Sequence, residues 1–303
     1  MIEPAALRAR YRADKAALMT SLATSGAATR GIGTLLRKIS ALTDTTLKTL
    51  WQQAGFTEPF ALLAVGGFGR GDLFPHSDID VLVLLPDDQS PDQDNSLRAQ
   101  LEGFIGSCWD AGLEIGSSVR SVSDCLSEAA KDVTVQTSLL EARLITGSQT
   151  LFADFQKSYF AAMDPEAFFI AKTLEMQQRH NKFEDTPYAL EPNCKESPGG
   201  LRDLQTILWV AKAAGLGSDW NALAKAGLAT AFELKQLKRN EAMLMLIRAR
   251  LHLLANRRED RLVFDLQNSV AQSFGYQPPD PSTDQRYFVR PSEQLMRHYY
   301  WSA

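Results

Sequence analysis

The segment Phe60–Leu85, FALLAVGGFGRGDLFPHSDIDVLVLL, carries the pattern that decides the fold. Its first six residues form a continuous apolar run, which is typical of a strand buried on both faces. Gly66 and Gly67 follow directly, so the backbone can turn tightly there and come close to a ligand. A second apolar strand is predicted from Asp78 onward. The segment therefore predicts a strand, a glycine turn, a short connection and another strand.

Two carboxylates share one face of the second predicted strand. Asp78 and Asp80 are one residue apart, and alternate side chains of a strand point to the same side. Neighbouring carboxylates repel each other unless a cation lies between them. Magnesium ions favour one or two carboxylates together with phosphate oxygens of a substrate. The pair therefore indicates a divalent metal site, although a solvated acidic strand end would show the same two residues.

The glycine turn strengthens the metal interpretation. Backbone N–H groups at Gly66 and Gly67 can cradle phosphate oxygens, and Arg70 adds a positive charge nearby. Neither the glycines nor the aspartates alone exclude an ordinary strand connection, but together they predict a nucleoside triphosphate held between the turn and two metal ions. The segment is not a P-loop, because no Gly-Lys-Ser/Thr sequence follows the glycines.

The composition limits the other possibilities. A chain of 303 residues holds one large domain or two small ones, and 45% hydrophobic with 22% charged residues is ordinary for a globular protein. A net charge of −4 disfavours a broad nucleic-acid-binding surface. Cys108, Cys125 and Cys194 are too isolated for a disulfide framework or structural zinc. The N-terminus lacks a signal-peptide pattern and no long apolar run follows, so we expect a cytoplasmic protein without membrane contact.

A second motif lies at Lys195–Val210, KESPGGLRDLQTILWV. With the Phe60–Leu85 segment, it resembles the bacterial PII uridylyltransferase/uridylyl-removing enzymes of the DNA polymerase β-like nucleotidyltransferase superfamily. The resemblance covers most of the chain from about Phe60 onward. It implies an α+β fold in which a small mixed sheet forms the nucleotidyltransferase core and a helical bundle domain follows. The implied division is 1–57 for N-terminal helices packing on the core, 58–125 for the core, and 126–303 for a helical domain that completes the nucleotide cleft.

The resemblance also assigns roles to single residues. Asp78 and Asp80 would be the catalytic metal ligands. The predicted nucleotide-binding residues are Gly66, Gly67, Arg70, Ser77, Lys195 and Arg202. Glu114 is the only acidic residue in a third predicted strand, Leu113–Val122, and could be a third metal ligand or simply a charged strand end. The resemblance to the related glutamine synthetase adenylyltransferases instead places Gly116 at the position of the third carboxylate. Arg120 on the same face could meet a phosphate or pair with an acidic neighbour.

The second motif has two interpretations. Pro198-Gly199-Gly200 followed by Asp203 is typical of a well-capped helix start, in which the carboxylate favours the positive end of the helix dipole. A helix start after glycines is also a natural anion site. The resemblance favours the second interpretation, in which this segment faces the nucleotide.

The activity implied by the resemblance is uridylyl transfer from UTP to a tyrosine of the PII signalling protein, with Mg²⁺ as cofactor and pyrophosphate as the second product. Two alternatives stay open: a protein adenylyltransferase of the glutamine synthetase type, and a non-catalytic nucleotide-binding regulatory module. The resembled family continues into a metal-dependent His-Asp hydrolase domain and two sensor domains. No such His-Asp pattern is visible here, so the sequence is expected to hold the transferase part only.

Outside the predicted strands the periodicity is almost entirely helical. Apolar residues recur every three or four positions in nine segments, and the last of them has a stripe of leucines expected in a core. The predicted helices are Ala5–Thr24, Gly31–Gln53, Ser96–Asp110, Val133–Thr146, Gln149–Ala162, Pro165–Asn181, Gly200–Ala214, Asp219–Ala226 and Thr230–Arg257.

Overall fold

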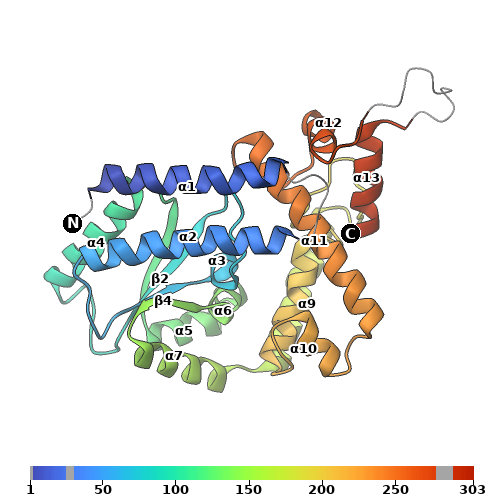
Figure 1. Cartoon of the computed structure of the whole chain (residues 1–303). Coiled ribbons are helices and arrows are strands. Elements are labelled where there is room, and N and C mark those ends of the chain that lie inside the picture. Colours follow the sequence, from blue (N-terminus) through green and yellow to red (C-terminus); the bar gives the residue numbers. More distant parts are fainter. Residues whose placement is uncertain (1–2, 25–30, 278–288) are drawn as a thin grey trace. The chain divides into compact units, whose positions relative to one another are not determined.

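The computed structural model describes residues 3–24, 31–277 and 289–303. The predicted α+β class is confirmed, since a four-stranded mixed sheet occurs together with many helices (Figure 1). Contacts divide the chain into two compact units. The first unit comprises Met1–Leu18, Leu36–Leu73 and Ser77–Asp164, and the second comprises Met19–Leu35, Phe74–His76 and Pro165–Ala303.

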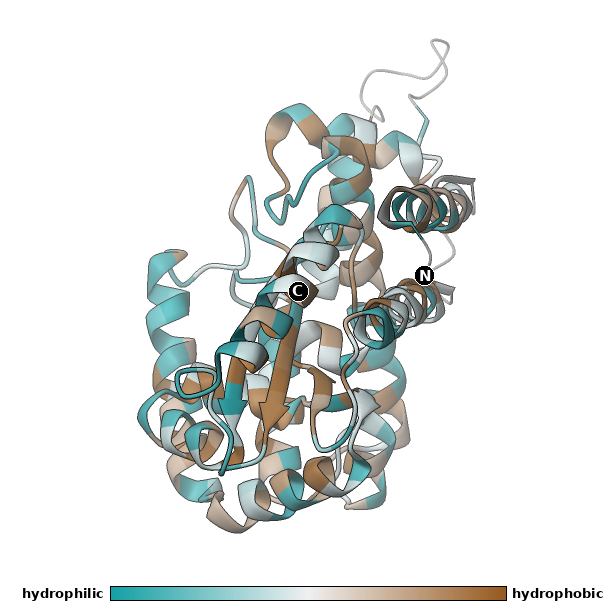
Figure 2. Ribbon diagram, turned by 90° about the vertical axis from the view of Figure 1, so that its left-hand side faces the viewer, coloured by the Kyte–Doolittle hydropathy of each residue, from teal (hydrophilic) through white to brown (hydrophobic). Residues whose placement is uncertain are grey.

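The sheet lies in the first unit and has the strand order β3-β2-β1-β4. Its strands are β1 (Ala61–Ala64), β2 (Ile79–Leu85), β3 (Ile115–Ser121) and β4 (Arg143–Gly147). β1 pairs with β2 and β4 in antiparallel fashion, whereas β2 and β3 are parallel. All four residues of β1 and six of the seven in β2 are buried, as a central position in the sheet requires. Figure 2 shows hydrophobic residues along these inner strands.

The strand β4 corrects the sequence-based prediction. Val133–Thr146 was expected to be one helix, but α6 (Val133–Leu140) ends early and β4 follows. Gly147 ends the strand with φ +97°, and a Cβ atom there would lie 2.3 Å from the Phe60 carbonyl oxygen. Pairing with β1 therefore outweighs the local helical periodicity, because tertiary context overrides weak propensity. The first unit extends to Asp164 and so includes β4.

The remaining elements of the first unit are helices around the sheet. The aromatic core joins two of them, since Trp51 of α2 stacks on Phe56 at 4.0 Å and meets Phe104 of α4 edge-on at 5.5 Å. Tyr11 Oη of α1 lies 3.2 Å from Thr43 Oγ1 of α2. These helices are α1 (Pro4–Thr24), α2 (Ile32–Gln53), α3 (Gly66–Arg70), α4 (Asn95–Asp110), α5 (Val122–Lys131), α6 and α7 (Gln149–Ala162), with parts of α1 and α2 contributing to the second unit.

The second unit is helical. The predicted leucine stripe is part of its core, because Leu244 and Leu251 of α11 are fully buried, as are Val270 and Leu295 on the two following helices. Its helices are α8 (Pro165–Lys182), α9 (Leu201–Ala213), α10 (Trp220–Lys225), α11 (Ala231–Ala255), α12 (Phe264–Ser273) and α13 (Pro291–Ser302). In the ranges given above, every helix is too short or too polar to traverse a bilayer.

Glycine 147 gives the first testable prediction. Gly147→Ala should lower the free energy of unfolding by about 1–3 kcal/mol, because its φ of +97° is strained for alanine and its Cβ would strike the Phe60 carbonyl. Chemical denaturation monitored by circular dichroism measures the change. Gly103→Ala in α4 is the matched control: nothing lies within 4 Å of its Cβ, so it should stabilise by about 0.5–1 kcal/mol. Equal effects of the two substitutions would contradict this account of β4.

Candidate active site

Asp80 marks the candidate active site, on the face of the sheet where β2 and β3 run side by side. Its side chain is exposed, while Ile79 and Val81 on either side are buried. In the parallel register Asp80 lies opposite Gly116, and a Cβ atom on Gly116 would stand 2.8 Å from Asp80 Oδ1. A side chain at position 116 would displace the carboxylate. Glycine opposite the aspartate therefore gives the Asp80 carboxylate its room.

The short helix α3 brings a second backbone segment to Asp80. Gly66 has φ +55°, and a Cβ atom there would lie 3.6 Å from both Asp80 Oδ2 and Ser138 Oγ. Because Gly66 and Gly67 are the first residues of a helix, their N–H groups have no acceptor within it. The predicted glycine turn is thus a five-residue helix, and its first residue lies beside Asp80. Ser138 of α6 joins them.

A pocket of about 360 Å³ opens over this face of the sheet. Asp80, Gly116 and Arg120 line it from the strands, and Thr134 and Ser138 line it from α6. Its volume falls within the range of small-molecule sites. In the part of the chain that the structure describes, the Arg120 guanidinium has no ion pair. A carboxylate and a cation on one wall suit a ligand that carries both phosphate oxygens and a metal ion.

Arg70 has a different environment from the one expected of a phosphate-binding cation. Its Nε lies 2.6 Å from Asp72 Oδ2, and its Nη1 pairs with Glu141. Burial alone would lower the pKa of Arg70, but Glu141 and then Asp72 outweigh it and raise the pKa. Arg143 supports the same helix, donating from Nε to the Gly69 carbonyl at 3.2 Å. Arg70 thus fixes α3 within the first unit, and phosphate binding by Arg70 stays a prediction.

Three other predicted residues lie near the start of β2 and β3. Asp78 is exposed one residue before β2, and strand alternation gives it the same side as Asp80. Ser77 is half-buried beside it. The Glu114 carbonyl accepts a hydrogen bond from Ile79 N at 3.1 Å. Burial raises the pKa of Tyr11, and the charge of Glu114 raises it further, so Glu114 has a neighbour on α1. Its role as a metal ligand stays a prediction.

Lys195 and Arg202 belong to the second unit, where they share one carboxylate. Lys195 Nζ lies 3.2 Å and Arg202 Nη2 3.1 Å from Glu196 Oε1. Burial lowers the pKa of Lys195, and the nearby Arg202 lowers it further. The Arg202 guanidinium also lies 5.2 Å from the ring centroid of Trp209. Gly66 and Asp80 belong to the first unit, and Lys195 and Arg202 belong to the second. Nucleotide binding by Lys195 and Arg202 stays a prediction.

The glycine turn of the second motif is organised by Asp203. Its carboxylate accepts hydrogen bonds from Gly199 N at 2.7 Å and from His180 Nε2 at 2.9 Å, and it also pairs with Arg179. Gly199 has φ +76°, and Gly200 is the N-cap of α9. The predicted helix start is confirmed. Asp203 stabilises the turn directly, as the capped-helix interpretation requires.

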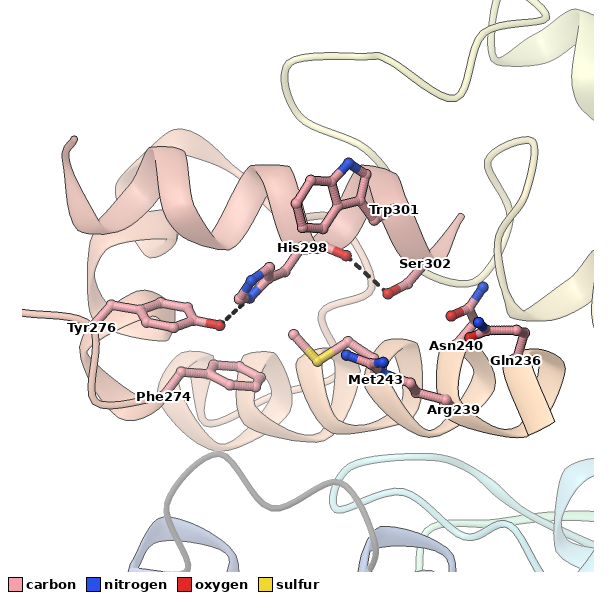
Figure 3. A pocket seen from close by; sticks show the side chains of 9 residues that line it. All are labelled: Gln236, Arg239, Asn240, Met243, Phe274, Tyr276, His298, Trp301 and Ser302. Atoms are coloured by element: carbon pink, nitrogen blue, oxygen red, sulfur yellow. Dashed lines mark hydrogen bonds between the residues drawn. The ribbon is translucent and has the colours of Figure 1, made fainter. Parts of the chain in front are cut away.

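A second pocket, of about 500 Å³, lies within the second unit (Figure 3). Tyr276 and His298 are hydrogen-bonded across it, and Ser302 Oγ donates to the His298 carbonyl at 2.8 Å. Burial lowers the pKa of His298, and the charges of Arg297 and Arg239 lower it further. None of the residues predicted to bind nucleotide or metal lines this pocket. The candidate active site is therefore the pocket beside Asp80.

Comparison with known proteins matches both parts of the chain. A family model described as GlnD PII-uridylyltransferase covers residues 167–303, and one described as nucleotidyltransferase domain covers residues 45–121. The bifunctional uridylyltransferase/uridylyl-removing enzymes of Burkholderia orbicola and Burkholderia mallei are each 55% identical over 98% of the chain, and that of Burkholderia lata is 54% identical over the same share. Over nearly its whole length the chain is similar to these bifunctional enzymes. It spans about a third of the length of these relatives, 33% in each case.

The two family matches follow the structure closely. The nucleotidyltransferase match contains β1, α3, β2 and β3, and so both aspartates and the glycine that faces Asp80. The uridylyltransferase match begins in α8 and contains the second motif with every later helix. The similarity to uridylyltransferases therefore involves both units and not the Asp-x-Asp motif alone.

The residues of α6 were not predicted as part of the site. Thr134 and Ser138 line the pocket because α6 ends at Leu140 and the chain then returns to the sheet as β4. No spacing in the sequence signals that return. Ser118 could have been found, because residues two apart on a strand share a face, and Gly116 and Arg120 on either side of it also line the pocket.

The two carboxylates fit a divalent-metal site that the phosphates of a bound substrate would complete. Among the residues whose structure is described, no group of three or more His, Cys, Asp or Glu side chains is placed to hold a metal. A dedicated protein cage is therefore not formed by these residues. Two exposed carboxylates at one strand start match the way Mg²⁺ binds through one or two carboxylates, water and substrate phosphates.

Substitution of Gly116 tests the geometry around Asp80. Gly116→Ala should weaken Mg²⁺-dependent nucleotide binding by about 10-fold or more, because the new Cβ would push the Asp80 carboxylate aside. The carboxylate can rotate away, so the fold should survive. Isothermal titration with nucleoside triphosphate and Mg²⁺ measures the loss. Gly106→Ala, whose Cβ meets nothing within 4 Å, is the control. An unchanged nucleotide affinity in Gly116→Ala would show that Asp80 is not part of the binding site.

Proposed function

We propose that the complete protein transfers the uridylyl group of UTP to a tyrosine of the PII signalling protein and releases pyrophosphate. The observation that supports this most directly is the meeting of Asp80, Gly116, Gly66 and Ser138 at one pocket. The relatives named as bifunctional uridylyltransferase/uridylyl-removing enzymes support the choice of nucleotide, and the family model described as GlnD PII-uridylyltransferase supports the choice of acceptor. Only the transferase reaction is assigned to this chain, because the nucleotidyltransferase match covers residues 45–121.

The protein contributes to the reaction in two ways: some groups provide charge, and others position the nucleotide. Asp78 and Asp80 would hold Mg²⁺, which when bound would neutralise charge on the triphosphate and favour the deprotonated acceptor oxygen. The N–H groups of Gly66 and Gly67 point to phosphate oxygens, as oriented backbone amides do in other anion sites. Arg120 supplies positive charge on the β3 side of the pocket. The walls from β3 and α6 orient the nucleotide against Asp80.

The chemical step is a displacement at phosphorus. The tyrosine oxygen attacks the α-phosphorus in line with the bond to the β-phosphate, that bond breaks, and pyrophosphate leaves. The hydroxyl proton is lost to solvent. The products are a tyrosyl-UMP ester and pyrophosphate. Positioning and electrostatic stabilisation carry most of such a reaction, which is consistent with a site built from carboxylates, backbone amides and one arginine.

One observation favours a second candidate function. The position opposite Asp80 is Gly116, so no third carboxylate stands there. A regulatory module that binds nucleotide without transferring it would have the same pocket and would not need a third carboxylate. A protein adenylyltransferase would differ from the proposed enzyme only in the base that it selects.

The decisive assay mixes the complete gene product with Mg²⁺, purified PII and each of the four nucleoside triphosphates. UTP should give pyrophosphate and a mass increase of one UMP per PII subunit. Asp80→Asn should reduce the rate by about 100-fold or more with the fold intact, since a group that stabilises developing charge is lost. A mass increase with ATP instead would establish adenylyl transfer. Mg²⁺-dependent UTP binding without a mass increase would establish the regulatory module.

Gly67 tests the phosphate cradle separately from the metal. Gly67→Asp should abolish measurable UTP binding, because a carboxylate beside the triphosphate adds repulsion as well as bulk. A Cβ at position 67 has ordinary contacts, the nearest at 3.8 Å, so the fold should tolerate the change. Gly67→Asn has the same size without the charge and should lose less affinity. Equal UTP affinity in wild type and Gly67→Asp, measured by titration calorimetry, would exclude the cradle.

A further inference from the structure

Asp260 is the centre of a buried charged cluster in the second unit. Arg248 Nε donates to Asp260 Oδ1 at 2.6 Å, and His252 Nε2 lies 3.0 Å from the same oxygen. Arg248 is 6% exposed and His252 is fully buried. Burial alone would raise the pKa of Asp260, but the hydrogen bond from His252 and the charge of Arg248 outweigh it and hold the pKa well below its usual range. Asp260 is therefore an ionised hydrogen-bond acceptor.

The second nitrogen of His252 reaches another part of the chain. His252 Nδ1 accepts a hydrogen bond from the backbone N–H of His76 at 3.2 Å. Because Nε2 donates to the Asp260 carboxylate, Nδ1 keeps its lone pair, and the carboxylate sets the tautomer. Arg248 supports the same segment, with its guanidinium carbon 4.0 Å from the centroid of the buried Phe74 ring.

The segment Phe74–His76, whose last N–H is bound by His252, lies just before Asp78, a predicted metal ligand. Phe74–His76 clusters with the second unit, while the chain before it and after it clusters with the first. Only Ser77 separates His76 from Asp78. Two residues of chain span about 7 Å at most. A fixed His76 N–H therefore restricts where the Asp78 carboxylate can lie.

The backbone of Asp260 holds the second motif as well. The Asp260 carbonyl accepts from Cys194 N at 2.7 Å, and the next residue, Arg261, forms a bridge with Asn193. The Cys194 carbonyl in turn accepts from Leu201 N at 3.0 Å, at the start of α9. Asp260 thus holds the second motif directly through its backbone, and it holds the His76 N–H indirectly, because its carboxylate fixes His252.

We propose that Asp260, His252 and Arg248 form a positioning hub that sets the Asp78-bearing segment, through the His76 N–H, together with the second motif, through Cys194. This inference rests on the proposed nucleotidyl transfer. A purely apolar junction would fill the same space without the desolvation cost of buried charges, and it would not orient an N–H group. The directional bond from His252 to His76 therefore carries the positioning role.

Two substitutions of His252 separate positioning from stability. Asparagine places an amide oxygen near Nδ1 and can still accept from His76, but it loses the bond to Asp260. Glutamine places its amide near Nε2 and can still donate to Asp260, but it loses the acceptor for His76. His252→Asn should therefore be less stable yet keep most of kcat. His252→Gln should stay stable while kcat falls about 10- to 100-fold, as for other residues that orient metal ligands.

The experiment uses the complete gene product. It measures Tm, kcat with UTP and PII, and the Mg²⁺ concentration for half-maximal rate. In His252→Gln this Mg²⁺ concentration should rise, which a merely structural role would not cause. His298→Asn and His298→Gln, the same changes at another histidine of the second unit, are matched controls and should leave both kinetic values unchanged.

Each outcome decides between the hub and its alternatives. Wild-type kcat and Mg²⁺ dependence in His252→Gln would overturn the hub, even if His252→Asn does not fold. The hub would also be overturned if kcat fell in proportion to Tm in both variants while the Mg²⁺ concentration for half-maximal rate stayed unchanged. His252 would then have a structural role only. A wild-type protein without transfer activity would instead refute the proposed function on which the hub rests.

Discussion

The candidate site depends on the parallel pairing of β2 with β3. A shift of that register by one residue would place Ser117 instead of Gly116 opposite Asp80, and the Asp80 carboxylate would lose the space that it occupies. The sheet order then fixes the rest, since β1 delivers Gly66 on one side of β2 and β3 delivers Arg120 on the other. The chemistry is therefore an outcome of strand pairing, with the polar side chains placed by apolar strands whose burial sets the register.

Much of this arrangement could be predicted from local pattern. The apolar run before Gly66, the alternation around Asp80 and the stripe ending at Leu251 each mark an element whose period is visible within a short window, and the corresponding elements are present. The neighbourhood of the glycines and Asp80 followed from their nearness in sequence. What failed was β4, because its strand character comes from pairing with β1, more than seventy residues earlier, and not from its own periodicity.

The site residues that could not be placed from sequence were missed for the same reason: their positions depend on contacts that are distant in sequence. Ser138 reaches the pocket only because β4 closes the sheet behind α6, and the partners of Arg70 include Glu141 in that same connection. Arg70 was expected to be a ligand-binding cation and has two carboxylate neighbours, while Arg120, which had two open interpretations, lines the pocket. An arginine's role depends on which carboxylates the fold brings to it, and those partners are non-local in both cases.

The path of the chain through Phe74–His76 has a consequence for how the protein can be divided. The family match to residues 167–303 gives one boundary at which the gene could be cut for separate expression of two pieces. A piece starting there would lack the Phe74 ring that lies against Arg248, and it would also lack Met19–Leu35. Its buried guanidinium would face water or an empty space, and His252 would have no backbone donor. The two units are consequently interleaved along the gene and are not modules that recombination could exchange one at a time.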